Sequence, residues 1–325
     1  FFCSSFLAFQ YLIARHVMSD DDGIICVIRL VDLQNEAIVA AVHRDMRRNY
    51  YASFDWSVPF YAAAAYEGFI ATAQDWGGGG ERSVALLPEI QRAYCVLDWA
   101  KLHVSRKARK RSAHYDLTVD QQLDRVLDGI RRHHVDADDG SSNSWVIPPY
   151  EELVRTMLGV NAAIPQASGR GVAMRLHSVE LIHRASGKLV GGEIGYSIGA
   201  TYTSLTGFFD NRPRDGAATQ RPEFDGAGTV QLVALASLLR NSGYEFWNLG
   251  HPPREATATK PACMLYKRDL GGCVISRAEF LRRWKASRDS APAAELSCTT
   301  PTTVRCILEG ARPSAERGSG EEVGR

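Results

Sequence analysis

The second half of the chain carries the clearest pattern of hydrophobic and polar positions. Apolar and polar residues alternate over 172–183 and again over 188–198, and Ser186-Gly187 between them supplies a turn. Because side chains on a strand point alternately to its two faces, this pattern predicts a β-hairpin. Residues 201–209 are rich in β-branched and aromatic side chains and predict a third strand.

The pattern then changes to that of helices and a buried strand. Residues 229–239 are nearly all apolar, which predicts a helix that is buried on all sides. Residues 244–249 predict a short buried strand, and 277–286 predict a further helix. The order β-β-β-α-β-α indicates a mixed sheet covered by helices, and the predicted fold class is α+β.

Residues 40–165 are predicted to be mainly helical. Thr118 and Gln121 fit a capping box, and Pro148-Pro149 can open a second helix over 150–158. The apolar positions that follow the capping box at helical spacing are Leu123, Val126, Leu127 and Ile130. They predict an amphipathic helix with one buried face.

These changes in the hydrophobic pattern divide the chain into four predicted segments. They are an N-terminal extension of undetermined structure at 1–40, a mainly helical domain at 41–168, a mixed-sheet domain at 169–288 and a disordered tail at 289–325. Residues 1–17 begin with an apolar run that is too short to span a membrane. This run also lacks the basic residues with which a signal peptide starts. We expect them either to come from an over-extended gene model or to form a genuine buried or targeting segment.

Composition narrows the class of protein. With 325 residues, 45% hydrophobic and 23% charged, the chain is not a disordered, collagen-like or multispan membrane protein. Its 38 basic and 37 acidic residues give a net charge of +1, so any nucleic-acid binding needs a local patch. The 7 cysteines are widely spaced without a C-x-x-C pair, which predicts a reducing, cytoplasmic location and no structural zinc or other metal.

One such patch lies in the first half of the chain. Six basic residues fall within eleven positions with no acid between them: Lys101, Arg106, Lys107, Arg109, Lys110 and Arg111. Each contact of such a residue with a phosphate releases counterions, so the cluster predicts local RNA affinity. The alternatives are a solvated surface and a localisation signal.

Two polar residues of the predicted sheet are candidate catalytic groups. Glu180 shares the apolar face of its strand, where a carboxylate is costly unless paired, and the alternatives are an edge position in water and a structural hydrogen bond. Asn248 ends a buried strand before Gly250, where it can face a cleft or form a turn. His177, on the opposite face from Glu180, is expected to face solvent.

The turn Gly226-Ala227-Gly228 precedes the buried helix, and a helix N-terminus attracts phosphate. The spacing is similar to the phosphate loop of acyl-CoA N-acyltransferases. However, Glu223 and Asp225 would repel a pyrophosphate, which argues against CoA.

Five strings of sequence together resemble the leucyl/phenylalanyl-tRNA–protein transferases. They occur in the order of that family, over about residues 55–285. The strings are His103-Val104-Ser105-Arg106, Trp145-Val146-Ile147, Leu176-His177-Ser178-Val179-Glu180, Leu189-Val190-Gly191-Gly192-Glu193-Ile194-Gly195-Tyr196 and Leu270-Gly271-Gly272-Cys273.

The resemblance implies a helical N-terminal domain and an acyl-CoA N-acyltransferase-like (GNAT-like) C-terminal domain. It implies transfer of Leu or Phe from aminoacyl-tRNA to the N-terminal amino group of proteins that begin with Lys or Arg, which marks them for N-end rule degradation, without metal, ATP or CoA. The basic cluster would hold the tRNA. The expected substrate-binding residues are Trp145, Met174, Tyr202, Phe208 and Gly228. Glu180 and Glu193 are candidate contacts for the basic first residue of the acceptor.

Three positions depart from the family pattern. Leu205 stands where the family has Glu, Asn248 where it has Asp, and Gly250 where it has Gln. Asn248 cannot accept a proton, but its amide could hold the amine or donate to an oxyanion, so we expect catalysis mainly by positioning. The reaction would take place in a crevice beside Glu180 and Asn248. The alternatives are a non-catalytic relative that binds tRNA or N-terminal peptides, and a CoA-dependent acyltransferase.

Overall fold

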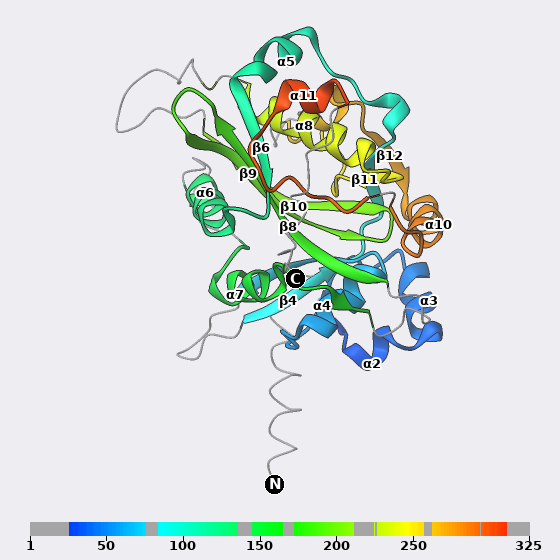
Figure 1. Ribbon diagram of the computed structural model, residues 1–325. Helices are drawn as coiled ribbons and strands as arrows, with labels where there is room; N and C mark the ends of the chain where they lie inside the picture. The colour runs from blue at the N-terminus through cyan, green and yellow to red at the C-terminus, as the bar shows by residue number, and fades with distance from the viewer. Residues whose placement is uncertain are drawn as a thin grey trace, which may run out of the picture.

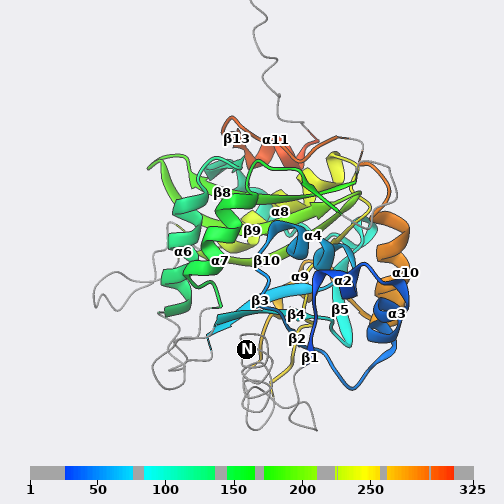
Figure 2. The same ribbon diagram turned by 90° about the horizontal axis from the view of Figure 1, so that it is seen from below.

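A large mixed sheet forms the centre of the molecule (Figures 1 and 2). The computed structural model describes residues 26–75, 84–135, 145–164, 172–210, 224, 226–256, 262–292 and 294–310. Within them, nine strands lie in the order β12-β5-β11-β10-β9-β8-β6-β13, with β7 also paired to β8. Their bounds are β5 Ala93–Leu97, β6 Tyr115–Val119, β7 Ala162–Ala163, β8 Ala173–His183, β9 Lys188–Ile198, β10 Thr201–Phe209, β11 Phe246–Asn248, β12 Cys273–Ser276 and β13 Thr302–Thr303.

The β10–β11 pair is the parallel one in this sheet, and its pairing is short. Thr201, Tyr202 and Thr203 pair with Phe246, Trp247 and Asn248 in turn. In the described part of the chain, β10 then continues to Phe209 with no strand on its β11 side. A register shift against β9 between Ser204 and Thr206 bends β10 where this pairing ends. Among the described residues, the last part of β10 is therefore unpaired on its β11 side, and we call this stretch, 204–209, the open end of β10.

Helices cover both faces of the sheet (Figures 1 and 2). On one face a core of buried residues joins the sheet to α5 (Arg106–Arg111), α8 (Ala227–Asn241) and α11 (Val304–Leu308). On the other face the core includes α4 (Val58–Tyr66), α6 (Leu123–Val135), α7 (Pro148–Met157) and α10 (Arg277–Ser287). The smaller elements are α2 Leu30–Leu33, α3 Glu36–Arg44 and α9 Tyr266–Asp269, the 3-10 turns η1 Trp99–Lys101 and η2 Ser112–His114, and the strand pairs β1 Cys26–Val27 with β2 Tyr51–Ala52 and β3 Ile70–Asp75 with β4 Val84–Glu89.

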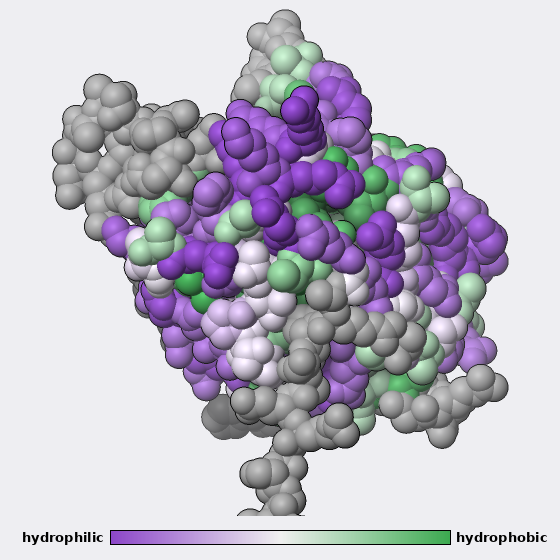
Figure 3. Space-filling model, turned by 45° about the horizontal axis from the view of Figure 1, so that its top comes forward, coloured by the Kyte–Doolittle hydropathy of each residue, from purple (hydrophilic) through white to green (hydrophobic). Residues whose placement is uncertain are grey.

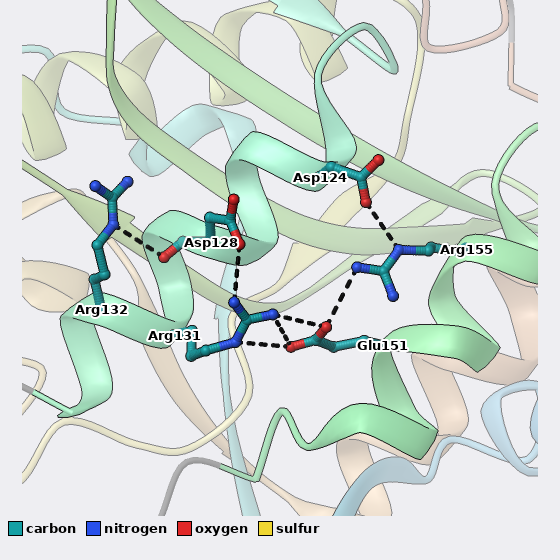
Figure 4. Close-up of polar contacts among 6 residues, drawn as sticks. All are labelled: Asp124, Asp128, Arg131, Arg132, Glu151 and Arg155. Carbon is teal, nitrogen blue, oxygen red and sulfur yellow. Dashed lines mark hydrogen bonds and ion pairs between the residues drawn. The ribbon is translucent and has the colours of Figure 1, made fainter.

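An ion-pair network joins α6 to α7 (Figure 4). Arg131 of α6 donates to both carboxylate oxygens of Glu151, at 2.6 and 2.8 Å, and Arg155 reaches the same carboxylate at 3.3 Å. Arg155 also pairs with Asp124 at 2.8 Å. The Glu151 side chain is only 6% exposed, so these contacts satisfy a buried charge.

The mixed sheet is as predicted, and β9 and β10 have the predicted bounds. The prediction of a mainly helical segment at 41–168 is only partly right: α4, α5, α6 and α7 lie within it, but so do β3, β4, β5 and β6. Thr118 is not a helix cap: it lies in β6, between β8 and β13. Pairing on both sides outweighs the local capping pattern there, although α6 does begin at Leu123 and buries the predicted apolar face.

The predicted disorder of 289–325 is also wrong for residues up to 310. Here β13 pairs with β6, and Val304 and Ile307 of α11 are completely buried. Two apolar residues in a short helix gain stability from the core they join, which no local pattern reveals. Residues 1–17 and 311–325 lie outside the described residues. No described helix is long and apolar enough to cross a membrane.

Candidate functional site

Glu180 is a structural carboxylate. Its side chain is 0% exposed, and the hydroxyl groups of Thr118 and Ser178 donate to it at 2.6 and 2.5 Å. The backbone N–H groups of Gln121 and Gln122, just before α6, donate to Oε1 at 3.3 and 3.1 Å. Burial raises the pKa of this carboxyl, against these hydrogen bonds, which lower it. Of the alternatives that the sequence left open for Glu180, the structure shows the structural hydrogen bond.

Asn248 ends β11 in a turn. Its Oδ1 accepts the N–H of Gly250 at 2.9 Å, and its Nδ2 donates to Thr203 Oγ1 at 3.3 Å. Gly250 has a φ of +72°, a conformation that favours glycine. The Asn248 side chain is 1% exposed. Of the two alternatives for Asn248, a residue facing a cleft and a residue in a turn, the structure shows the turn.

The structure does not bring Glu180 and Asn248 together. Glu180 is level with Gly192 on the next strand, whereas Asn248 is level with Thr203, Tyr196 and Leu176. Three strand spacings and four residues along a strand separate them by roughly 20 Å. Both are buried with paired polar atoms, and among the described residues they lie too far apart to face one shared crevice.

A different carboxylate, Glu193 of β9, lies beside the open end of β10. It is 4% exposed, and its Oε1 accepts hydrogen bonds from Tyr202 Oη at 3.2 Å and Ser204 Oγ at 2.8 Å. Trp247 of β11 donates its indole N–H to Ser204 Oγ at 2.9 Å. Three adjacent strands thus build one hydrogen-bonded array.

Glycines make this array sterically feasible. A Cβ on Gly195 would lie 2.3 Å from Tyr202 Oη, so only glycine leaves room for the phenol to cross β9 toward Glu193. A Cβ on Gly207, opposite Glu193, would lie 2.9 Å from the glutamate Cβ. The sequence signal that could have identified this site is therefore a glutamate flanked by glycines in the string Gly191–Gly195.

The electrostatics of Glu193 suit a proton acceptor. Burial raises its pKa from 4.5 to about 7, although the hydroxyls of Ser204 and Tyr202 partly oppose this. A group with that pKa can gain and lose a proton near neutral pH. Among the described residues, no cluster of His, Cys, Asp or Glu has the arrangement of a metal site.

Tyr266 of α9 lies near enough to Glu193 for the charge of that carboxylate to act on its phenol. The residue is 48% exposed, yet its hydroxyl is surrounded by protein. This desolvation, followed by the charge of Glu193, raises the pKa of Tyr266 to about 12. Next to it, buried Lys267 donates to the carbonyl oxygens of Leu249 and His251, both at 2.7 Å, and so fixes the segment that follows β11.

The other predicted substrate residues have mixed positions. Tyr202 belongs to the Glu193 array, and Gly228 lies in the first turn of α8, where a Cβ would be 3.1 Å from the ring of Phe209. Trp145, Met174 and Phe208 belong to the core on the opposite face of the sheet. Phe208 packs so closely on α6 that a Cβ on Gly129 would lie 2.4 Å from its ring. These three side chains therefore fill the core.

The basic cluster divides between two elements. Arg106, Lys107, Arg109, Lys110 and Arg111 make up most of α5, and the first four are exposed. The side chain of Arg111 reaches from α5 to the start of α8, where a Cβ on Gly226 would be 2.3 Å from the guanidinium. Lys101 is in η1 instead, with Nζ 3.5 Å from Cys273 Sγ. Glu223 and Asp225 lie outside the described residues.

His177 is buried at 3% exposure, contrary to the expectation that it faces solvent. Its Nδ1 lies 3.1 Å from Asp120 Oδ2, and its Nε2 lies 3.0 Å from Ser197 Oγ. Asp120, His177 and Ser197 follow one another as the groups of a hydrolase triad do. However, Ser197 is only 6% exposed, which leaves a substrate little access to its hydroxyl. The arrangement satisfies buried polar groups.

Comparison with solved structures gives distant likenesses, among them the following three. No family model and no curated protein match the chain. The crystal structure of FemX has a TM-score of 0.40 at 8% identity, covering 75% of this chain and 76% of that one. L-PGS from Bacillus licheniformis has 0.32 at 12%, covering 59% and 56%. The C-terminal domain of a putative lysylphosphatidylglycerol synthetase from Agrobacterium fabrum has 0.32 at 16%, covering 69% and 58%. At these TM-scores the likenesses carry no argument about function.

Proposed function

We propose that the chain is an aminoacyltransferase that moves Leu or Phe from aminoacyl-tRNA to the N-terminal amino group of proteins that begin with Lys or Arg. The observation that carries the proposal is the buried Glu193 carboxylate at the open end of β10, held by Tyr202 and Ser204. It supports amide formation because an attacking amine must give up a proton. The sequence resemblance supports the choice of donor and acceptor.

In the proposed reaction, the α-amino nitrogen attacks the ester carbonyl of the aminoacyl-tRNA. A C–N bond forms, the ester C–O bond breaks, and the tRNA leaves with a free ribose hydroxyl. Glu193 accepts the proton that the amine loses and can return it to the leaving oxygen. An α-ammonium group has a pKa of about 7.7–8.0, so a base with a pKa of about 7 is well matched to it.

Tyr202 and Ser204 have positioning roles in this proposal. Their hydroxyls hold one oxygen of Glu193, and the indole of Trp247 fixes Ser204. The exposed basic residues of α5 would hold the tRNA phosphates, as the sequence predicts. Glu180 and Asn248, whose polar atoms are already paired, take no part in the chemistry.

A transfer assay tests the proposal. Purified full-length chain is mixed with tRNA charged with labelled Leu, Phe or Met, and with peptides that begin with Lys, Arg or Ala. We expect label from Leu or Phe only on Lys- and Arg-peptides. Glu193→Gln should slow transfer by about 10²–10⁴-fold. Glu279→Gln, at a side chain of α10 that is 41% exposed, should leave transfer unchanged.

The departures at Leu205, Asn248 and Gly250 favour one second candidate, a non-catalytic relative that binds tRNA or N-terminal peptides. Salt-sensitive tRNA binding without any transfer would select it. Thermal stabilisation by acetyl-CoA, with acetyl transfer to the same peptides, would contradict both candidates and indicate a CoA-dependent enzyme.

A further inference from the structure

A basic pocket lies between α5 and α11, two helices from distant parts of the chain. Its cavity volume is about 420 Å³, and its charged lining comes from Arg106, Arg109 and Lys110 of α5 and from Arg305 and Glu309 at α11. Figure 3, in which the top of Figure 1 comes forward, shows hydrophilic residues gathered over the end of the molecule that carries these two helices.

The positive charges of this pocket have no acidic partner in the described part of the chain. Arg106, Arg109, Lys110 and Arg305 are all exposed, and none of them forms an ion pair there. Glu309, which lines the same pocket, is also unpaired among the described residues. Four cations facing one carboxylate attract an anion, and Arg side chains suit phosphate oxygens in particular.

The walls are held in place without a ligand. Ala108 of α5 and Val304 and Ile307 of α11 are buried in the core that also contains α8. Strand β13, directly before α11, pairs with β6. The volume falls in the usual range of small-molecule sites, about 300–1,000 Å³, which is enough for one nucleotide.

We propose that the α5–α11 pocket binds one phosphate-bearing nucleotide of an RNA chain, with Arg305 as the contact from the C-terminal segment. The choice of RNA as the source of the phosphate rests on the proposed function. Arg106, Arg109 and Lys110 hold the phosphate together with Arg305, while Leu308 offers an apolar contact to the nucleotide. The C-terminal segment thus contributes to RNA binding.

The test measures binding of uncharged tRNA to the full chain from about 50 to 300 mM salt, without any transfer step. Arg305→Ala and Arg109→Ala should each weaken binding roughly threefold to tenfold at low salt and lower the salt slope by about one. Arg282→Ala, an exposed arginine of α10 that is 70% exposed, should behave as the wild type.

Two results would overturn the inference. One is tRNA binding by Arg305→Ala that equals the wild type at every salt concentration. The other concerns small phosphate compounds: adenosine monophosphate or inorganic phosphate protects the wild type against thermal unfolding but does not protect Arg305→Ala, although both proteins bind tRNA with the same affinity. That result would assign the pocket to a free phosphate compound.

The inference and the proposed function fail separately. Arg305-dependent tRNA binding in a protein that transfers nothing would keep this pocket and reject the transferase. Transfer of Leu or Phe with tRNA affinity indifferent to Arg305→Ala would do the reverse.

Discussion

Two buried carboxylates on neighbouring strands, Glu180 and Glu193, have different surroundings. Glu180 accepts four hydrogen bonds, two of them from backbone groups at the start of α6. Glu193 accepts two from hydroxyl groups and lies close enough to the half-exposed Tyr266 to act on its pKa. Glu180 is therefore the more firmly held of the two, while the raised pKa of Glu193, about 7, makes it the candidate base.

Replacing Glu180 should destabilise the fold. Glu180→Ala leaves the hydroxyls of Thr118 and Ser178 without their acceptor in the interior, at a cost of about 3 kcal/mol or more. Glu180→Gln keeps one acceptor oxygen and should cost less. Urea unfolding followed by circular dichroism measures both variants, and an Ala variant as stable as the wild type would show that Glu180 is not a structural group.

Glu193 should make stability fall as pH rises. Its folded pKa of about 7 exceeds the ordinary 4.5, so between these values the folded state binds more protons than the unfolded state. Ionisation at higher pH then costs up to about 3 kcal/mol. Urea unfolding of wild type and Glu193→Gln at pH 5 and pH 8 measures the difference. The variant should gain stability relative to the wild type at pH 8, and an equal offset at both pH values would contradict the raised pKa.

At the scale of elements, the sequence predicted the strands and helices whose pattern is local. The alternation of β8 and β9, the β-rich run of β10 and the apolar spacing of α6 all correspond to elements of the structure. What failed was decided by distant partners. Thr118 satisfies a capping pattern, but β6 is fixed by pairing with β8 and β13.

The candidate site shows the same limit. Glu180 attracted attention because it lies on an apolar face, yet three of its four hydrogen-bond donors come from residues 118–122, in and just after the neighbouring strand β6. Glu193 became a candidate base only when the register placed Tyr202 and Ser204 beside it. Such cross-strand contacts depend on register, which single-strand patterns do not determine.

The contact between α6 and α7 should depend on Glu151. Glu151→Ala removes the buried acceptor of Arg131 and Arg155, whose side chains are 47% and 39% exposed, and should cost about 1–2 kcal/mol. Asp128→Ala removes an exposed partner of Arg131 and should change stability by less than about 0.5 kcal/mol. Equal losses in urea unfolding would mean that burial of the pair contributes nothing.

At the scale of the whole molecule, the C-terminal segment completes one face of the sheet. Ile307 is completely buried, so Ile307→Ala should destabilise the chain by about 2–4 kcal/mol. Exposed Arg305 on the same helix provides the control, because Arg305→Ala should stay within about 0.5 kcal/mol of the wild type. Thermal unfolding of both variants checks this, and an unchanged Ile307→Ala would mean that α11 is not part of the cooperative fold.

The most direct test of the account is the pH dependence of single-turnover transfer of Leu from charged tRNA to a Lys-peptide. For the wild type, the rate should rise with pH through about 7 as Glu193 loses its proton, and further as the peptide amine loses its own at about 7.7–8.0. Glu193→Gln should keep only the rise of the amine and lose about 10²–10⁴ of the rate. A Glu193→Gln rate and pH profile that match the wild type would contradict the assignment of Glu193 as the base.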